Sequence, residues 1–110
     1  MHPRRGEVWW VSFDKSVGGE IQKTRPAIIL SNNAANAVLN RVIVVPLSSQ
    51  IDKIFPGEAI ITLNGNQSKA KADQIATTAK PRLQNKMGTV SISDLAAVEK
   101  AVLVQLGIRR

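Results

Sequence analysis

Arg25 is the residue whose type and position most directly suggest chemistry. It stands immediately before Pro26, where the apolar run PAIILS begins. The proline ring disfavours helical backbone at the preceding residue and fixes the start of the run, so we expect Arg25 to have an extended conformation. A guanidinium held in this way could present its planar fork to a phosphodiester. The alternative role is an ion pair with Glu20, which the local sequence by itself favours.

Hydroxyl and amide side chains offer the remaining polar chemistry. Ser48 and Ser49 follow the apolar run RVIVVPL, and their hydroxyls could donate hydrogen bonds to a phosphate oxygen. Serine is also a common turn residue, and that use is the alternative. Asp73 and Gln74 lie within AKADQIATTA, where they could bond a base edge or a ribose, or could belong to a polar outer face.

The residue types that are missing narrow the chemistry further. The chain has no cysteine, which excludes disulfides, thiolate zinc sites and a thiol nucleophile, and which fits a reducing cytoplasm. His2 is the only histidine, so a histidine pair, a histidine-based triad and a multi-histidine metal site are excluded. Gly18-Gly19 lacks the spacing of a phosphate-binding loop. We expect Asp52 and Glu58 to be a solvated loop pair, and we expect neither a metal nor a cofactor.

The charge of the chain indicates a polyanionic partner. Fifteen Lys and Arg stand against eight Asp and Glu, which gives a net charge of +7 and a pI near 10.4. Many small basic proteins bind no nucleic acid, so the distribution of charge is more informative than its sum. From residue 66 to residue 86 five cations minus one carboxylate leave a local excess of +4. The cations of this stretch are Lys69, Lys71, Lys80, Arg82 and Lys86.

The elements that must position these residues are mostly short strands. EVWWVSFD, from Glu7 to Asp14, has the aromatic and β-branched residues of a strand. Alternation places Trp9 on the core face and Trp10 on the opposite, more exposed face. An exposed Trp10 could stack on a base or could be partly covered by a neighbouring loop or subunit.

The rest of the chain predicts more strands and two helices. Strands are expected at residues 26–31, 41–47, 58–63, 70–79 and 88–91. Asn32 or Asn33 could cap a short helix after the first of these, Pro46 predicts a bulge or a strand end, and residues 15–24 predict a mobile loop.

A closing amphipathic helix has the clearest signals of all. Its apolar side chains are Leu95, Val98, Val102 and Leu106, its cap is Ser91 or Ser93, and Gly107 ends it. Strands followed by one helix predict a mainly β (α+β) domain over residues 1–110, in the form of a small, strongly bent barrel or half-barrel, with residues 1–5 disordered. No segment approaches the roughly 18 apolar residues of a membrane span, so we expect a soluble, intracellular protein.

The motifs, taken in order, resemble the MazF/PemK family of bacterial toxins. They are RRGEVWWVSFD, the G-x-E of Gly18 and Glu20 followed by TRPAIILSN, VIVVPLSS, KADQIAT with PRL, and SDLAAVEKAVLVQLGI, from about Arg5 to Ile108. The resemblance implies an SH3-like, strongly curved antiparallel barrel of the MazF/CcdB type with a C-terminal α-helix, working as a homodimer. It also implies the toxin of a type II toxin–antitoxin system, a metal-independent endoribonuclease that cuts single-stranded RNA through attack by the 2′-hydroxyl. The antitoxin partner is expected to have an acidic, disordered tail.

Site residues follow from the same resemblance. Arg25 falls on the family's Arg-Pro pair and would neutralise charge on the phosphorane. Ser48 falls on the hydroxyl position after the third strand and would bond a non-bridging oxygen. Glu20 matches the acidic residue of the G-x-E loop and would orient Arg25 or act as base. The expected RNA-binding residues are Ser49, Lys71, Asp73, Gln74, Thr77, Lys80 and Arg82.

Two other functions remain open on the sequence. A gyrase inhibitor like CcdB has the same fold, but this chain has the Arg-Pro pair of the nuclease branch and ends in LGIRR without an aromatic residue. An SH3-like RNA-binding module without activity is the second. PemK-type members resemble Arg-x-Asp-Gln where this chain has Lys71-Ala72-Asp73-Gln74, so their complete catalytic scheme does not transfer to this chain.

Overall fold

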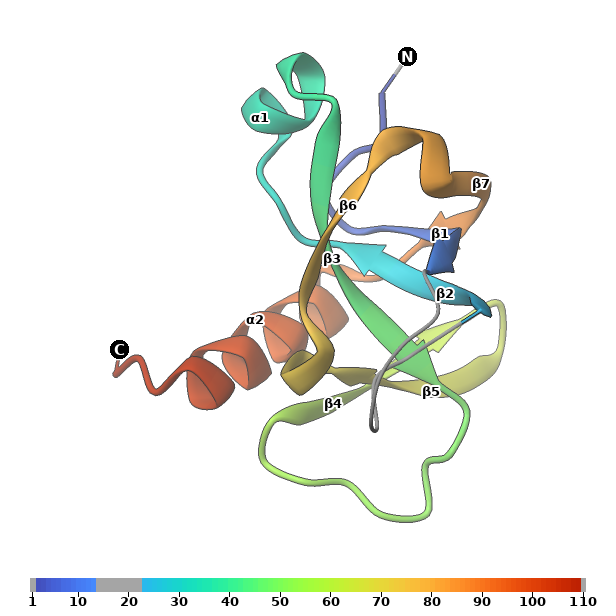
Figure 1. The fold of residues 1–110 in the computed structure, drawn as a ribbon. Helices are drawn as coiled ribbons and strands as arrows, with labels where there is room; N and C mark the ends of the chain where they lie inside the picture. Colours follow the sequence, from blue (N-terminus) through green and yellow to red (C-terminus); the bar gives the residue numbers. More distant parts are fainter. Residues whose placement is uncertain (1, 14–22, 110) are drawn as a thin grey trace.

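A computed structural model describes residues 2–13 and 23–109 of the chain (Figure 1). These residues form seven strands, two α-helices and two single-turn 3-10 helices. In order they are β1 (Glu7–Phe13), β2 (Lys23–Ile29), α1 (Asn33–Val38), β3 (Arg41–Ser48), β4 (Glu58–Leu63), β5 (Asn66–Lys71), η1 (Ala72–Gln74), β6 (Ala76–Ala79), η2 (Lys80–Arg82), β7 (Leu83–Thr89) and α2 (Ile92–Leu106).

Strand β3 runs through the middle of the fold and changes partners along its length (Figure 1). The sheet is antiparallel, with the order β4-β5-β3-β2-β1-β7 and with β6 paired to β3. The first half of β3 pairs with β6, Val44 to Pro46 pair with β2, and Leu47 and Ser48 pair with β5. Pro46, which has no N–H to donate, thus marks a change of partner instead of the predicted bulge or strand end. This change of partner bends the sheet strongly.

The two outermost strands of this order, β4 and β7, approach each other through side chains. The Asn64 side-chain amide donates to the Met87 carbonyl at 3.4 Å. A Cβ on Gly88 would lie 3.0 Å from Leu63 Cδ1, so glycine permits the close approach at this point. In the described residues β4 and β7 do not pair through their backbones. The predicted curved antiparallel fold is therefore confirmed, with a barrel that strand pairing leaves open between β4 and β7.

The sheet separates two apolar clusters. One contains Ile28 and Val45 together with the buried face of α2, and the other contains Ala27, Ile29 and Val44. Because neighbouring residues of β2 and β3 belong to different clusters, both strands are buried on both faces. Such strands are expected to be continuous apolar runs, which is how their sequences appear.

Strand β1 confirms the predicted difference between its tryptophans. Trp9 packs against the second cluster, whereas Trp10 is 37% exposed.

Helix α2 begins and ends where the sequence predicts. The Ser91 hydroxyl accepts a hydrogen bond from Asp94 N–H at 3.1 Å, and Gly107 takes the left-handed conformation with φ of 72°. Val98 and Val102 are buried, but Leu106 is 55% exposed, so the predicted core face is wrong in the last turn. In the described part of the chain no helix has the length and apolar character needed to cross a membrane.

Three other expectations need correction. The predicted strand over 70–79 is interrupted by η1, and β7 takes up most of the basic segment predicted to precede a short strand. Disorder at residues 1–5 is wrong for the described part, because Arg5 N–H donates to Asn33 Oδ1 at 2.7 Å and its guanidinium pairs with Glu99. The predicted loop at 15–24 lies mostly outside the described residues, and its last two residues begin β2.

Candidate active site

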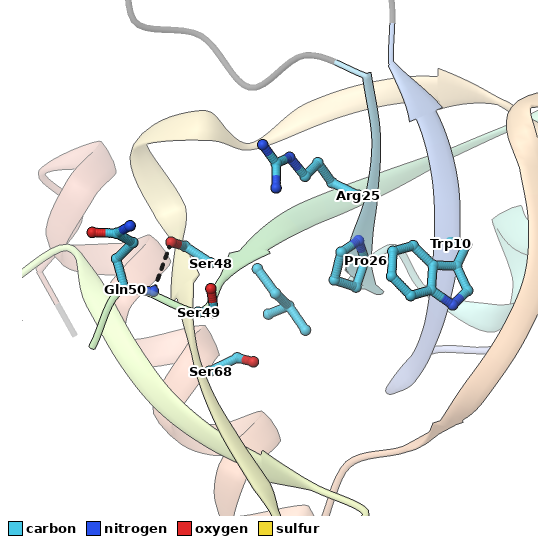
Figure 2. Close-up of a pocket in the computed structure, with 8 residues that line it drawn as sticks. Trp10, Arg25, Pro26, Ser48, Ser49, Gln50 and Ser68 are labelled. Atoms are coloured by element: carbon cyan, nitrogen blue, oxygen red, sulfur yellow. Dashed lines mark hydrogen bonds between the residues drawn. The ribbon is translucent and has the colours of Figure 1, made fainter.

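A groove of about 350 Å³ opens where the start of β2, the exposed face of β1 and the end of β3 meet (Figure 2). We call it the groove. Its lining residues are Trp10, Arg25, Pro26, Leu47, Ser48, Ser49, Gln50 and Ser68. Three of the predicted site residues, Arg25, Ser48 and Ser49, are therefore brought together from strands that are distant in sequence.

Arg25 places a cation at the edge of the groove. It lies on β2 in register with Val11 of β1, and it is exposed. Its side chain extends toward the side of the groove where Ser48 and Gln50 lie (Figure 2). Within residues 2–13 and 23–109 it makes no hydrogen bond or ion pair, so its guanidinium can accept an anion. Glu20, its expected partner, lies outside the described residues, as do Gly18 and Gly19.

Ser48 supplies one of the three serine hydroxyls that line the groove. It is the last residue of β3 and pairs in register with Lys69 of β5. Its Oγ accepts a hydrogen bond from Gln50 N–H at 3.2 Å (Figure 2). This bond is the local turn use expected of serine, but it uses a lone pair and leaves the hydroxyl hydrogen available to donate. Turn residue and oxyanion donor are thus compatible roles for Ser48.

An apolar wall faces these polar groups. Trp10 and Pro26 are register partners on β1 and β2, and their rings lie beside each other (Figure 2). Leu47 continues this wall and is 3% exposed. An aromatic face beside a cation and a hydroxyl suits a nucleotide, which has both a base and a phosphate.

Sequence reasoning missed Gln50 and Ser68 as groove residues. Gln50 follows Ser48 by two positions, so the turn expected there could have indicated it. Ser68 had no comparable local signal, because its place depends on the pairing of β5 with the end of β3.

Lys71 lies in a separate hollow, beside a carboxylate that the sequence led us to expect in solvent. The Glu58 side chain is 5% exposed, and its two oxygens lie 3.1 Å from Lys69 Nζ and 2.9 Å from Lys71 Nζ. We call these three residues the Glu58 cluster. Burial by itself raises the pKa of Glu58, but the hydrogen bond from Phe55 N–H and the two ammonium groups outweigh it and lower the pKa from 4.5 to about 2. Lys71 therefore has a charged partner within the fold. The prediction that Lys71 contacts RNA did not take this partner into account.

The other predicted RNA-binding residues do not line the groove. Asp73 is exposed and shares the hollow of the Glu58 cluster. Gln74 ends η1, Thr77 is exposed on β6, and Lys80 begins η2. Arg82 donates from Nη1 to the Ser12 carbonyl at 3.2 Å.

Comparison with known proteins agrees with the fold and with the family that the motifs resemble. A family model described as "PemK-like, MazF-like toxin of type II toxin-antitoxin system" matches residues 4–106. Endoribonuclease MazF9 of Mycobacterium tuberculosis is 38% identical, over 96% of this chain and 97% of that protein. Endoribonuclease toxin MazF of Escherichia coli is 31% identical, over 96% and 95%.

Solved structures show the same fold at lower identity. MazF from Deinococcus radiodurans superposes with a TM-score of 0.84 at 24% identity, over 98% of this chain and 99% of that one. A mycobacterial endoribonuclease in complex with its cognate antitoxin gives 0.83 at 24%, over 98% of each chain. On the family match and the curated relatives together, this chain belongs to the family of PemK-like, MazF-like toxins of type II toxin–antitoxin systems.

Proposed function

We propose that this chain is an endoribonuclease toxin that cuts single-stranded RNA in the groove, with Arg25 and Ser48 acting on the scissile phosphate. One observation carries the proposal. A guanidinium with no partner among the described residues and a hydroxyl whose hydrogen is available line the same groove. Two relatives, endoribonuclease MazF9 and endoribonuclease toxin MazF, support the reaction class by their names.

The proposed reaction needs no nucleophile from the protein. The ribose 2′-oxygen attacks the adjacent phosphorus and loses its proton, the bond from phosphorus to the 5′-oxygen breaks, and that oxygen gains a proton. The products are a 2′,3′-cyclic phosphate and a 5′-hydroxyl. Negative charge grows on the non-bridging oxygens in the transition state, where Arg25 neutralises it and Ser48 donates a hydrogen bond. Glu20 orients Arg25 or accepts the 2′-hydroxyl proton.

The remaining groove residues suit an unpaired nucleotide. The faces of Trp10 and Pro26 offer a stacking surface for a base, and stacking accepts every base because each has a π-face. Ser49, Gln50 and Ser68 offer hydroxyl and amide groups for base edges. Asp73, Gln74, Thr77, Lys80 and Arg82 remain proposed contacts for RNA that extends beyond the groove.

We also propose two protein partners. A second copy of the chain would cover the exposed apolar side chains around α1, where Val38 is 79% exposed and Leu39 and Ile43 are also exposed. A cognate antitoxin with an acidic, disordered tail would complement the net charge of +7. The mycobacterial relative in complex with its cognate antitoxin supports the second partner.

The test is cleavage of a mixed single-stranded RNA in EDTA, with the product ends mapped by sequencing and by end chemistry. We expect cyclic phosphate and 5′-hydroxyl ends, no cutting at a site whose 2′-hydroxyl is replaced by hydrogen, and a severe loss of rate in Ser48→Ala. Intact RNA would contradict the nuclease, and cutting of the 2′-deoxy site would contradict the mechanism.

A further inference from the structure

The segment of residues 49–57 joins the groove to the Glu58 cluster. We call it loop 49–57. Its first two residues, Ser49 and Gln50, line the groove, and its last three, from Phe55 to Gly57, lead into Glu58 at the start of β4. The position of the Phe55 end of the loop therefore affects where the side chains of Ser49 and Gln50 lie.

Apolar packing does not hold this loop down. Ile54 is 43% exposed and Phe55 is 60% exposed, and most other residues of the loop are exposed as well. Its fixed contacts are polar instead. Glu58 N–H donates to the Phe55 carbonyl at 2.9 Å, and Phe55 N–H donates to Glu58 Oε1 at 3.0 Å.

Lys69 connects the two ends of the loop. Its backbone pairs in register with Ser48, which precedes the loop, and its ammonium donates to the Lys53 carbonyl at 3.0 Å within the loop. The same ammonium lies 3.1 Å from Glu58 Oε1 and 5.9 Å from the centre of the Phe55 ring. The Lys69 side chain is 9% exposed. A buried ammonium with directed acceptors defines a geometry more narrowly than an apolar side chain of the same length could.

We infer that the Lys69–Glu58 ion pair sets the position of loop 49–57, and through Ser49 and Gln50 the nucleotide preference of the groove. Lys69 and Glu58 are positioning residues in this scheme, since neither lines the groove. The inference rests on the proposed function, because a nucleotide preference requires that RNA bind in the groove. Arg25 and Ser48 lie on strands outside the loop, and the Ser48 hydroxyl hydrogen is available to donate with or without the bond that its Oγ accepts from Gln50 N–H. The ion pair therefore acts on substrate selection and not on the chemical step.

The test compares Lys69→Met with the conservative Lys69→Arg and with Lys86→Met. Lys86 forms a different ion pair, 3.0 Å from Glu7 Oε2, and does not line the groove. For each protein kcat and KM are measured on one defined RNA, the cut sites in a mixed RNA are mapped, and amide hydrogen exchange is followed in loop 49–57. Should Lys69→Met fail to fold, Glu58→Gln replaces it, because the amide oxygen of the new side chain is still an acceptor for Phe55 N–H.

For Lys69→Met we expect faster exchange in the loop, cuts at a wider set of sequences, unchanged kcat, and a KM raised about tenfold, the effect of losing one hydrogen bond to the substrate. Lys69→Arg restores the wild-type pattern, and Lys86→Met leaves the cut sites unchanged. An unchanged cut pattern in Lys69→Met, or the same change in Lys86→Met, would overturn the inference. A wild type that cuts no RNA would overturn the proposed function instead, and the exchange data would still decide whether Lys69 holds the loop.

Discussion

The groove and the Glu58 cluster are neighbours that use their cations in opposite ways. They share strand β5, where Ser68 faces the groove and Lys69 belongs to the cluster. In the cluster both lysines are bonded to a carboxylate that is 5% exposed. In the groove Arg25 is exposed and has no partner among the described residues. Of these three cations, Arg25 is the one whose charge has no partner in the described part of the fold, and it is the one proposed to act on RNA.

The difference has a physical reason. Two opposite charges removed from water interact strongly, and separating them leaves a buried charge unpaired at high cost. The lysines of the cluster therefore keep Glu58 as their partner when a phosphate approaches. An exposed guanidinium at the mouth of a groove has no such bond to break, so its full charge is available to a substrate.

Replacing Arg25 by alanine should have the largest effect of the changes that test this comparison. We expect the cleavage rate to fall by about 100-fold or more, because a charged donor to the transition state is lost. Stability should change by less than about 0.5 kcal/mol, because the side chain is exposed. Single-turnover cleavage and urea unfolding measure the two quantities.

Arg4→Ala is the matched control, since Arg4 is also exposed but does not line the groove. It should retain the wild-type rate. Full activity in Arg25→Ala would leave Arg25 as a structural residue.

Glu58→Gln tests whether the Glu58 cluster stabilises the fold. We expect a loss of about 2 kcal/mol, because Lys69 and Lys71 lose a charge-assisted acceptor. Urea denaturation of this variant and of Asp52→Asn, an exposed carboxylate in loop 49–57, provides the measurement. Equal stabilities of the two variants would show that the buried ion pairs of Glu58 stabilise the fold no more than an exposed carboxylate does.

Acid should weaken the cluster in a defined window. The pKa of Glu58 is lowered in the folded chain, so its contribution to stability is complete above pH 4.5 and is lost as pH falls toward about 2. Burial by itself raises the pKa of Glu7, but hydrogen bonds from Arg4, Lys86 and Trp9 outweigh it and lower that pKa as well. Glu7 therefore adds to the loss of stability in acid. We expect the stability of the wild type to fall more steeply than that of Glu58→Gln in urea melts across this window. Parallel curves would contradict the prediction.

Lys71→Met should have the smallest effect on RNA. The salt dependence of RNA binding counts the lysines and arginines that neutralise phosphates. Lys71 is already paired with Glu58, so we expect that it neutralises no phosphate. Its removal should change RNA affinity by about twofold or less and leave the salt dependence unchanged. Titration of a fluorescent 2′-O-methyl RNA at several salt concentrations measures both quantities. A clear fall in the salt slope would return Lys71 to the RNA-binding set.

The sequence predicted the parts of the fold that depend on local chemistry. The Ser91 cap and Gly107 end of α2 and the Asn32 cap of α1 all use residues that act on their own backbone. The break between β5 and β6 and the partner change of β3 were not predictable in this way, because they are set by which strands meet in the folded sheet.

The site residues also fall into those that local sequence predicted and those that depend on the folded sheet. Arg25 and Ser48 were found through the local motif and the family resemblance, and the fold brings them into one groove. The roles of Lys69, Lys71 and Glu58 were not foreseen, because charge counted along the chain cannot tell whether a lysine faces solvent or a carboxylate thirteen residues away.

The most direct test is an NMR titration of the protein with a short single-stranded 2′-O-methyl RNA, which lacks the nucleophile and cannot be cut. We predict that the resonances of the Trp10 indole, the Arg25 guanidinium and the Gln50 amide shift on binding, while those of the Lys71 side chain, which is paired with Glu58, stay in place. Shifts centred on Lys71, with the groove unchanged, would contradict the assignment of the groove as the RNA site.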